Sequence, residues 1–119
     1  MLTKIAVTAF ALGMATHSVA QAEFAKIQDE DSFRQLVSGK VLTRPLVKLE
    51  VSPQGRITGR GAAWDVTGRW TWRDGYFCRE LNWGGSDLGY NCQEVRVNRD
   101  RIRFTSDKGA GDSADFRMR

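Results

Sequence analysis

The dipeptide Asp74-Gly75 lies between two segments in which apolar and polar residues alternate, Val66 to Arg73 and Tyr76 to Trp83. Alternation with a period of two is typical of a β-strand that has one buried face. An aspartate–glycine pair is the strongest short-range signal for a two-residue hairpin turn, because both turn positions require a positive φ. The sequence therefore predicts a β-hairpin in which Arg73 pairs with Tyr76.

The chain contains two cysteines, Cys78 and Cys92, and the first of them lies in the second strand of this hairpin. We expect them to form a disulfide between neighbouring strands, worth about 3 kcal/mol in the chain-entropy model for a loop of about 15 residues. With the cysteines opposite each other, the same register gives three further pairs: Glu80 with Tyr90, Asn82 with Leu88, and Trp83 with Asp87. The turn left over is Gly84-Gly85-Ser86, a plausible three-residue hairpin loop.

The remaining segments extend the same pattern. Further strands are predicted over Leu46 to Val51, Arg56 to Ala62, Val95 to Val97, Ile102 to Thr105 and Ala114 to Met118. One helix is predicted over Gln28 to Gly39, with Asp29 or Asp31 as its N-cap. The expected fold class is α+β, mostly β. Its architecture is an antiparallel meander of six or seven strands forming a small barrel or half-barrel, with the N-terminal helix packed on it.

The first 22 residues have the pattern of a secretory signal peptide. Lys4 precedes an uncharged apolar run, Ile5 to Ala15, and a small–x–small triplet ends at Ala22. The run is shorter than the roughly 20 residues that span a bilayer. We expect cleavage after Ala22, with Ala20 as the alternative, and a single β-rich domain over residues 23–119. Export to the periplasm or cell exterior would also let the two thiols oxidise.

The sequence excludes several chemistries. The only histidine, His17, lies in the predicted signal peptide, so catalysis by a serine–histidine or cysteine–histidine pair is not expected. Usual zinc sites are excluded for the same reason. Residues 109–114 fit the dinucleotide fingerprint G-x-G-x-x-G/A, but only five residues follow and they alternate like a strand. We interpret residues 106–113 as a connection between strands, and expect no catalytic residue, cofactor or metal.

Aromatic residues and arginines gather between Trp64 and Tyr90. One interpretation is that Trp70, Trp72 and Phe77 form the core of a small barrel, because aromatic residues dominate small cores. The other is a stacking surface with arginine beside it, which suits sugars, nucleotides or an anionic partner. The candidate binding residues for that surface are Trp83, Arg73, Tyr76, Arg69, Asp87 and Trp64.

The charge balance limits the expected partners. From residue 23 onward there are 17 basic and 14 acidic residues, a net charge of +3. This modest excess and the predicted export argue against a nucleic-acid partner. We expect a monomer that does not insert into a membrane after signal cleavage, and whose partner is an unknown small ligand or envelope protein.

Two motifs also suggest a relationship. Residues 68–79, GRWTWRDGYFCR, and residues 89–93, GYNCQ, carry the elements G-x-W-x-W-x-D-G-x-[FY]-C-R and N-C-Q. They resemble a family of short exported bacterial proteins, and the resemblance covers most of the chain after residue 22. Members often carry the name dihydrodipicolinate reductase. A true reductase of that name has a full nucleotide-binding domain and works in the cytoplasm, so the resemblance implies the fold and export rather than that activity.

Three functions thus remain to be compared. The leading hypothesis is an exported small binding module that uses the aromatic and arginine surface. The alternatives are an envelope-protection or enzyme-inhibitor protein, suggested by small disulfide-bearing barrels that inhibit lysozymes, and the disfavoured reductase. We do not expect an enzyme.

Overall fold

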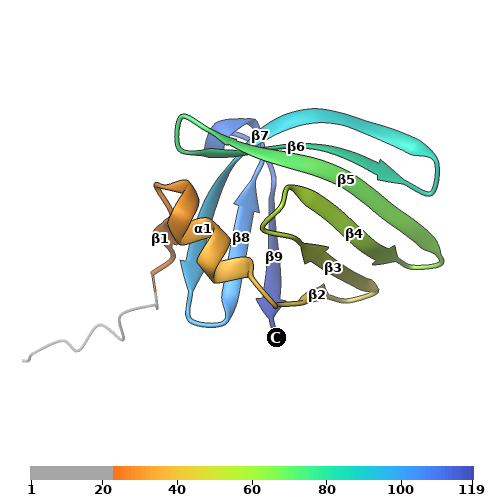
Figure 1. Cartoon of the computed structure of the whole chain (residues 1–119), viewed down its shortest axis with the longest axis horizontal. Coiled ribbons are helices and arrows are strands. Elements are labelled where there is room, and N and C mark those ends of the chain that lie inside the picture. The colour runs from red at the N-terminus through yellow and green to blue at the C-terminus, as the bar shows by residue number, and fades with distance from the viewer. Residues whose placement is uncertain (1–22) are drawn as a thin grey trace, which may run out of the picture.

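The computed structural model describes residues 23–119 (Figure 1). The predicted signal peptide and its cleavage site fall on residues 1–22, outside the described residues. The elements, in chain order, are β1 (Ala25–Lys26), α1 (Glu30–Val37), β2 (Leu42–Arg44), β3 (Val47–Val51), β4 (Arg56–Gly61), β5 (Trp64–Arg73), β6 (Tyr76–Trp83), β7 (Ser86–Asn98), β8 (Arg101–Thr105), the 3-10 turn η1 (Asp107–Gly109) and β9 (Ser113–Met118).

Eight of the nine described strands close into an antiparallel barrel. From β2 to β9 each strand pairs with the next along the chain, and β2 pairs with β9 to complete the ring. The two-residue strand β1 pairs with β7 at Val97 and Arg96, beyond the stretch of β7 that pairs with β6. The mostly β barrel was predicted correctly, but the count of six or seven strands was wrong. The two strands nearest the N-terminus have two and three residues, too few to show an alternating pattern.

The predicted hairpin and the disulfide are both present. Arg73 pairs with Tyr76 across the turn, and Asp74 and Gly75 both have positive φ, 51° and 86°. Cys78 lies opposite Cys92 and is bonded to it, and Glu80 faces Tyr90 as the register required. Strand β6 is therefore fixed on both sides, by the turn to β5 and by a covalent bond to β7.

The register predicted beyond Glu80 was wrong. Asn82 pairs with Asp87 and Trp83 pairs with Ser86, because a β-bulge leaves Leu88 as an extra residue on β7. The turn is consequently the two glycines Gly84-Gly85, with φ of 57° and 90°, rather than three residues. Two glycines accept the tight turn that suits the strand twist, and the bulge absorbs the residue that this leaves over. Strand β7 runs without a break from Ser86 to Asn98, so the strand predicted over Val95 to Val97 is the last part of β7.

The helix is shorter than predicted. It covers Glu30–Val37, and Asp29 is its N-cap: the Asp29 carboxylate accepts a hydrogen bond from the Ser32 backbone N–H at 2.9 Å. The chain leaves the helix at Ser38 and turns at Gly39, which has a φ of 70°. The helix therefore presents two turns to the barrel, with Phe33 and Val37 as its buried residues.

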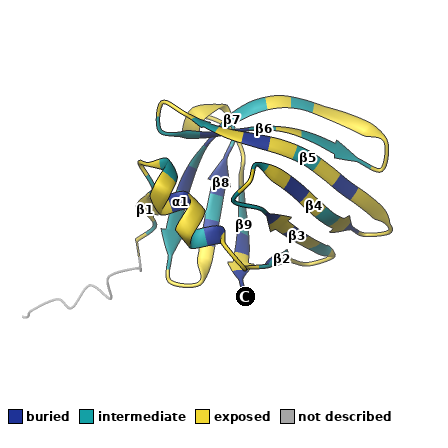
Figure 2. Ribbon diagram, in the orientation of Figure 1, coloured by how far each residue is buried: buried dark blue, intermediate teal, exposed yellow. Residues whose placement is uncertain are grey.

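The helix covers one end of the barrel. Arg34 donates a hydrogen bond to the Pro53 carbonyl, in the turn between β3 and β4, at 2.7 Å. In an up-and-down meander the β3–β4, β5–β6 and β7–β8 turns share this end, and the β2–β3, β4–β5 and β6–β7 turns share the other (Figure 1). Buried residues line the inside of the strands and the inner side of the helix (Figure 2). We call the end with α1 the closed end and the other the open end.

The segment that matches the dinucleotide fingerprint is a connection, as predicted. Residues 106–112 link β8 to β9 and contain the single turn η1. The residues after it form strand β9, so no helix begins there to offer its N-terminal amides to a phosphate. Within residues 23–119 we find no helix that is long and apolar enough to cross a membrane.

Candidate functional site

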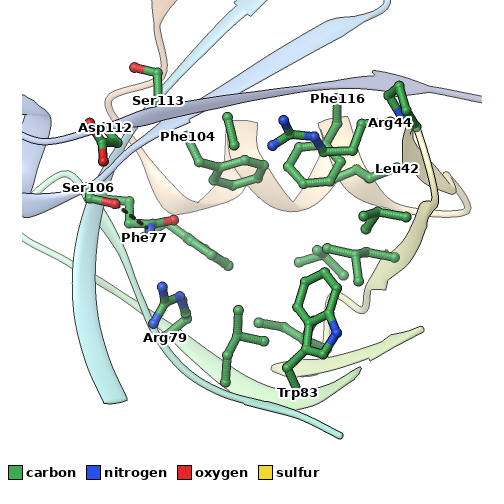
Figure 3. Close-up of a pocket in the computed structure, with 18 residues that line it drawn as sticks. Leu42, Arg44, Phe77, Arg79, Trp83, Phe104, Ser106, Asp112, Ser113 and Phe116 are labelled. Atoms are coloured by element: carbon green, nitrogen blue, oxygen red, sulfur yellow. Dashed lines mark hydrogen bonds between the residues drawn. The ribbon is translucent and has the colours of Figure 1, made fainter. Parts of the chain in front are cut away.

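A cavity of about 480 Å³ lies inside the barrel (Figure 3). Its volume is within the range of roughly 300–1,000 Å³ that small-molecule sites occupy. The cavity is lined by residues from seven strands and from the β2–β3 and β8–β9 connections. They are Leu42, Arg44, Pro45, Val47, Leu49, Val51, Ile57, Phe77, Arg79, Leu81, Trp83, Gln93, Phe104, Ser106, Asp112, Ser113, Ala114 and Phe116.

An aromatic cluster forms the floor of this cavity. Phe77 and Phe104 line the cavity, and their rings also contact Phe33 of α1, with centroids 5.1 and 6.5 Å away. The same two rings lie 5.1 Å from each other. The closed end is thus filled by packed rings, and the empty space begins where they end.

Trp83 forms the wall of the cavity nearest the open end. It occupies the last position of β6 and faces inward, like Phe77 and Leu81 on the same strand. Its indole lies over the backbone of Gly61, where a β-carbon would overlap the ring. The buried Gly61 on β4 therefore provides the room that Trp83 needs.

Arg79 places a positive charge on the cavity wall. It lines the cavity (Figure 3) and donates a hydrogen bond to the Gly89 carbonyl at 2.9 Å. On strand β6 it lies two residues from Phe77 and two from Leu81, which line the cavity too. Partial burial lowers the pKa of its guanidinium, because removal from water disfavours the charged form. Among residues 23–119, Arg79 forms no ion pair. A cation in this position lacks the carboxylate that usually accompanies a buried charge.

The other polar lining groups differ from Arg79. The guanidinium of Arg44 stacks 5.6 Å from the Phe116 ring. The pKa of Asp115 lies below its ordinary value mainly because Arg103 donates a hydrogen bond to its carboxylate, and the charge of Arg44 contributes least. Gln93 donates a hydrogen bond to the Ser106 hydroxyl at 3.4 Å. Asp112 is the one acid among the lining residues and is exposed on the β8–β9 connection. The cavity is therefore mainly apolar, with two cations and one anion.

Three of the predicted binding residues lie at the open end. Trp83 lines the cavity, as described. Trp64 is 55% exposed and packs against Gly84 at the rim, outside the set that lines the cavity. The Asp87 carboxylate accepts a hydrogen bond from the Gly89 N–H at 2.8 Å, which stabilises the bulge.

The other three candidates lie elsewhere. Arg73 and Tyr76 flank the β5–β6 turn at the closed end, and the eight residues of β6 separate Tyr76 from Trp83 by roughly 24 Å. The Tyr76 ring lies under the ammonium groups of Lys26 and Lys108, at 5.2 and 5.6 Å. Arg69 is exposed on the outer face. The structure thus does not bring the six residues together, and their binding role remains a prediction.

The interpretation of the aromatic segment as core is confirmed for its central residues. Trp70 and Phe77 are each 4% exposed, and the Trp70 indole N–H donates to the Ser52 carbonyl at 2.9 Å. The sequence hypothesis missed Arg79 as a site residue. Its signal was present, because Arg79 alternates in phase with Phe77 and pairs directly with Trp70, so it had to share the aromatic face.

Comparisons with protein-family models, curated proteins and solved structures gave no match. The resemblance to short exported bacterial proteins is therefore still a prediction. No group of three or more histidine, cysteine, aspartate or glutamate side chains in the described part of the chain could hold a metal ion. The class that fold and site define is a small disulfide-bonded β-barrel with an internal, mostly apolar cavity.

Proposed function

We propose that this protein is an exported binding module that holds a small, mostly apolar molecule inside its barrel. One observation carries the proposal: a cavity of about 480 Å³ lined by aliphatic and aromatic side chains. Eight-stranded barrels are just wide enough either to be filled by their own side chains or to hold one small ligand. Here the aromatic rings fill the closed end only, which leaves room for a ligand beneath Trp83.

The closure of the barrel also supports an internal site. Strands β2 and β9 pair with each other, as do β7 and β8, so the sheet closes on itself and encloses the inner faces of its strands. The sequence hypothesis put the binding surface on the outside of the β5–β6 hairpin, whereas the present proposal puts it on the inner face. Trp83 is a binding residue in both.

A neutral apolar probe tests the proposal without relying on charge. We expect N-phenyl-1-naphthylamine to bind the purified protein with increased probe fluorescence, because the cavity shields it from water. Trp83→Ala should weaken this binding about tenfold, since it removes the largest ring of the wall. Thermal melting of each variant verifies that it folds.

Trp64→Ala is the matched control. It removes the same side chain at the same end of the barrel, but from the rim, and should leave probe binding within about twofold of wild type. If the probe does not bind the wild-type protein, the proposed function is wrong. Equal losses in the two variants would place the site on the outer surface instead.

The export part of the proposal has a separate measurement. It is supported by the signal-peptide pattern of residues 1–22 and by the Cys78–Cys92 bond, which suits an oxidising compartment. Mass spectrometry of the natural product should give a chain that begins at Glu23 with both sulfurs oxidised. A chain that retains the first 22 residues would contradict export.

A further inference from the structure

The inner wall of the barrel carries a charge whose counter-ion is not supplied by the residues that the structure describes. Arg79 faces the cavity from the middle of β6, between two apolar neighbours on the same face, Phe77 and Leu81. A guanidinium has five N–H donors, and here one of them is used, by the Gly89 carbonyl. The unused donors border a space large enough for a ligand.

The local backbone fixes the position of this arginine. The Gly89 carbonyl adjoins the bulge at Leu88, and Gly89 itself has a φ of 77°, a conformation that glycine accepts readily. The Gly89 N–H is held in turn by the Asp87 carboxylate. The bulge thus provides an acceptor that orients one edge of the guanidinium and leaves the rest of it to the cavity.

The second cation on the wall is less suited to bind an anion. Arg44 is exposed and its guanidinium stacks on the Phe116 ring. Figure 3 shows Arg44 and Arg79 on opposite sides of the cavity, with apolar side chains between them. Arg79 is therefore the half-buried cation of the two, and within residues 23–119 it forms no ion pair, even with Asp112, the acid that also lines the cavity.

We propose that the ligand is an amphiphile whose anionic group binds Arg79 and whose apolar body lies against the wall that ends at Trp83. This inference rests on the proposed function and adds the chemical class of the ligand. A carboxylate, sulfate or phosphate accepts paired hydrogen bonds from a guanidinium, and such charge-assisted bonds are about twice as strong as neutral ones. The aliphatic and aromatic wall favours an alkyl or aryl body.

The test compares three molecules that share one alkyl chain and differ in charge: dodecanoate, dodecanol and dodecyltrimethylammonium. Each is titrated at neutral pH, below its micelle concentration, against protein loaded with N-phenyl-1-naphthylamine. We expect dodecanoate to displace the probe at a concentration at least tenfold lower than dodecanol, and the cation to displace it least. A dodecanol affinity equal to that of dodecanoate, or a preference for the cation, would overturn the inference while leaving the cavity function intact.

Two arginine variants localise the effect. Arg79→Met removes the charge and keeps an apolar chain of similar length, and should weaken dodecanoate binding at least tenfold with little effect on dodecanol. Arg69→Met makes the same change of net charge on the outer face and should leave both affinities within about twofold. Equal losses in the two variants would show that the general positive charge, rather than Arg79, attracts the anion.

The outcomes separate this inference from the proposed function. If the probe itself does not bind the wild-type protein, both are wrong. If the probe binds and none of the three amphiphiles displaces it, only the ligand class is wrong.

Circular dichroism of Arg79→Met verifies its fold. Arg79→Lys is a second test of the same position, because it keeps the charge but loses the paired hydrogen bonds. We expect its affinity for dodecanoate to lie between wild type and Arg79→Met, and an affinity as low as that of Arg79→Met would contradict a role for the charge.

Discussion

The two ends of the barrel use aromatic residues in opposite ways. At the closed end Phe33 is fully buried and its ring contacts four others, those of Trp70, Trp72, Phe77 and Phe104. At the open end Trp83 is partly exposed and borders empty space instead of another ring. Aromatic side chains thus stabilise the fold at the closed end, where several rings pack together. At the open end a single aromatic ring borders the cavity and shapes the candidate site.

The cause of this difference is the helix. Strand sequences at both ends alternate apolar and polar residues, so both would leave apolar side chains at an opening. Helix α1 brings Phe33 and Val37 to one opening and buries both of them fully. The open end has turns of two residues instead: Gly84-Gly85 carries no side chain, and Leu46 in the β2–β3 turn is 82% exposed, so neither turn fills the interior as the helix does. Stability and ligand binding should therefore be separable by mutation.

The largest expected effect is at the closed end. Phe33→Ala should lower the free energy of unfolding by about 3–5 kcal/mol, because it removes a buried ring and leaves a cavity within a packed cluster. Urea denaturation monitored by circular dichroism measures the loss. A loss below about 1 kcal/mol would mean that the helix does not close the core, and the contrast between the ends would fail.

An intermediate effect is expected at the open end from Gly61→Ala. The new β-carbon overlaps the Trp83 ring, so the indole must leave its position. Overpacking of this kind costs about 1–3 kcal/mol, and the lower end applies because a partly exposed side chain can move away. We expect an altered tryptophan emission spectrum and weaker binding of the neutral probe. Unchanged probe binding would show that Trp83 does not define the cavity wall.

The smallest effect concerns the cap of the helix. The Ser32 backbone N–H and hydroxyl both bond to Asp29, and the backbone bond is the main reason why the pKa of Asp29 lies below its ordinary value of 3.8. Because the folded-state pKa is depressed, the stabilisation is present above pH 3.8 and disappears as the pH falls through the folded-state pKa. Asp29→Ala should lower the melting temperature by a few degrees at neutral pH.

The control for the cap is Asp29→Asn, which keeps an oxygen acceptor for Ser32 but cannot ionise. It should melt close to wild type, and the small difference between the two should shrink as the pH falls below 3.8. Thermal melts at a series of pH values measure this. A difference that grows in acid would contradict the capping role of the carboxylate.

The turn and the helix cap were predictable from the sequence because each depends on a few neighbouring residues. Asp74-Gly75 determines a turn whose φ values few other pairs accept, and that turn sets the register of β5 against β6. The cysteine count then predicted the bond between Cys78 and Cys92, and that bond set the register of β6 against β7 as far as Glu80 and Tyr90. The cap was predicted at Asp29 or Asp31, and the structure has it at Asp29; such a cap is predictable because a side chain three residues from its backbone partner needs no tertiary contact.

The candidate site was only partly predictable. Alternation placed Arg79 on the same face as Trp70 and Phe77, but it could not show whether that face was filled with side chains or partly empty. The binding hypothesis named Arg69 and Arg73 because arginines lie beside aromatic residues in this segment. Trp83 was the one candidate that the cavity includes.

The amino-acid sequence alone determined the hairpin between β5 and β6, its covalent link to β7, and which side chains share each strand face. These follow from turn chemistry, from a single pair of cysteines and from a two-residue period. Tertiary structure decided that the sheet closes through β2 and β9, that the β6–β7 turn slips by a bulge at Leu88, and that the inner face encloses space around Arg79. The physical reason is the separation along the chain of the residues that interact. Pairing between strands that lie about 75 residues apart, and the volume left inside a closed barrel, depend on all eight strands together and on no local pattern.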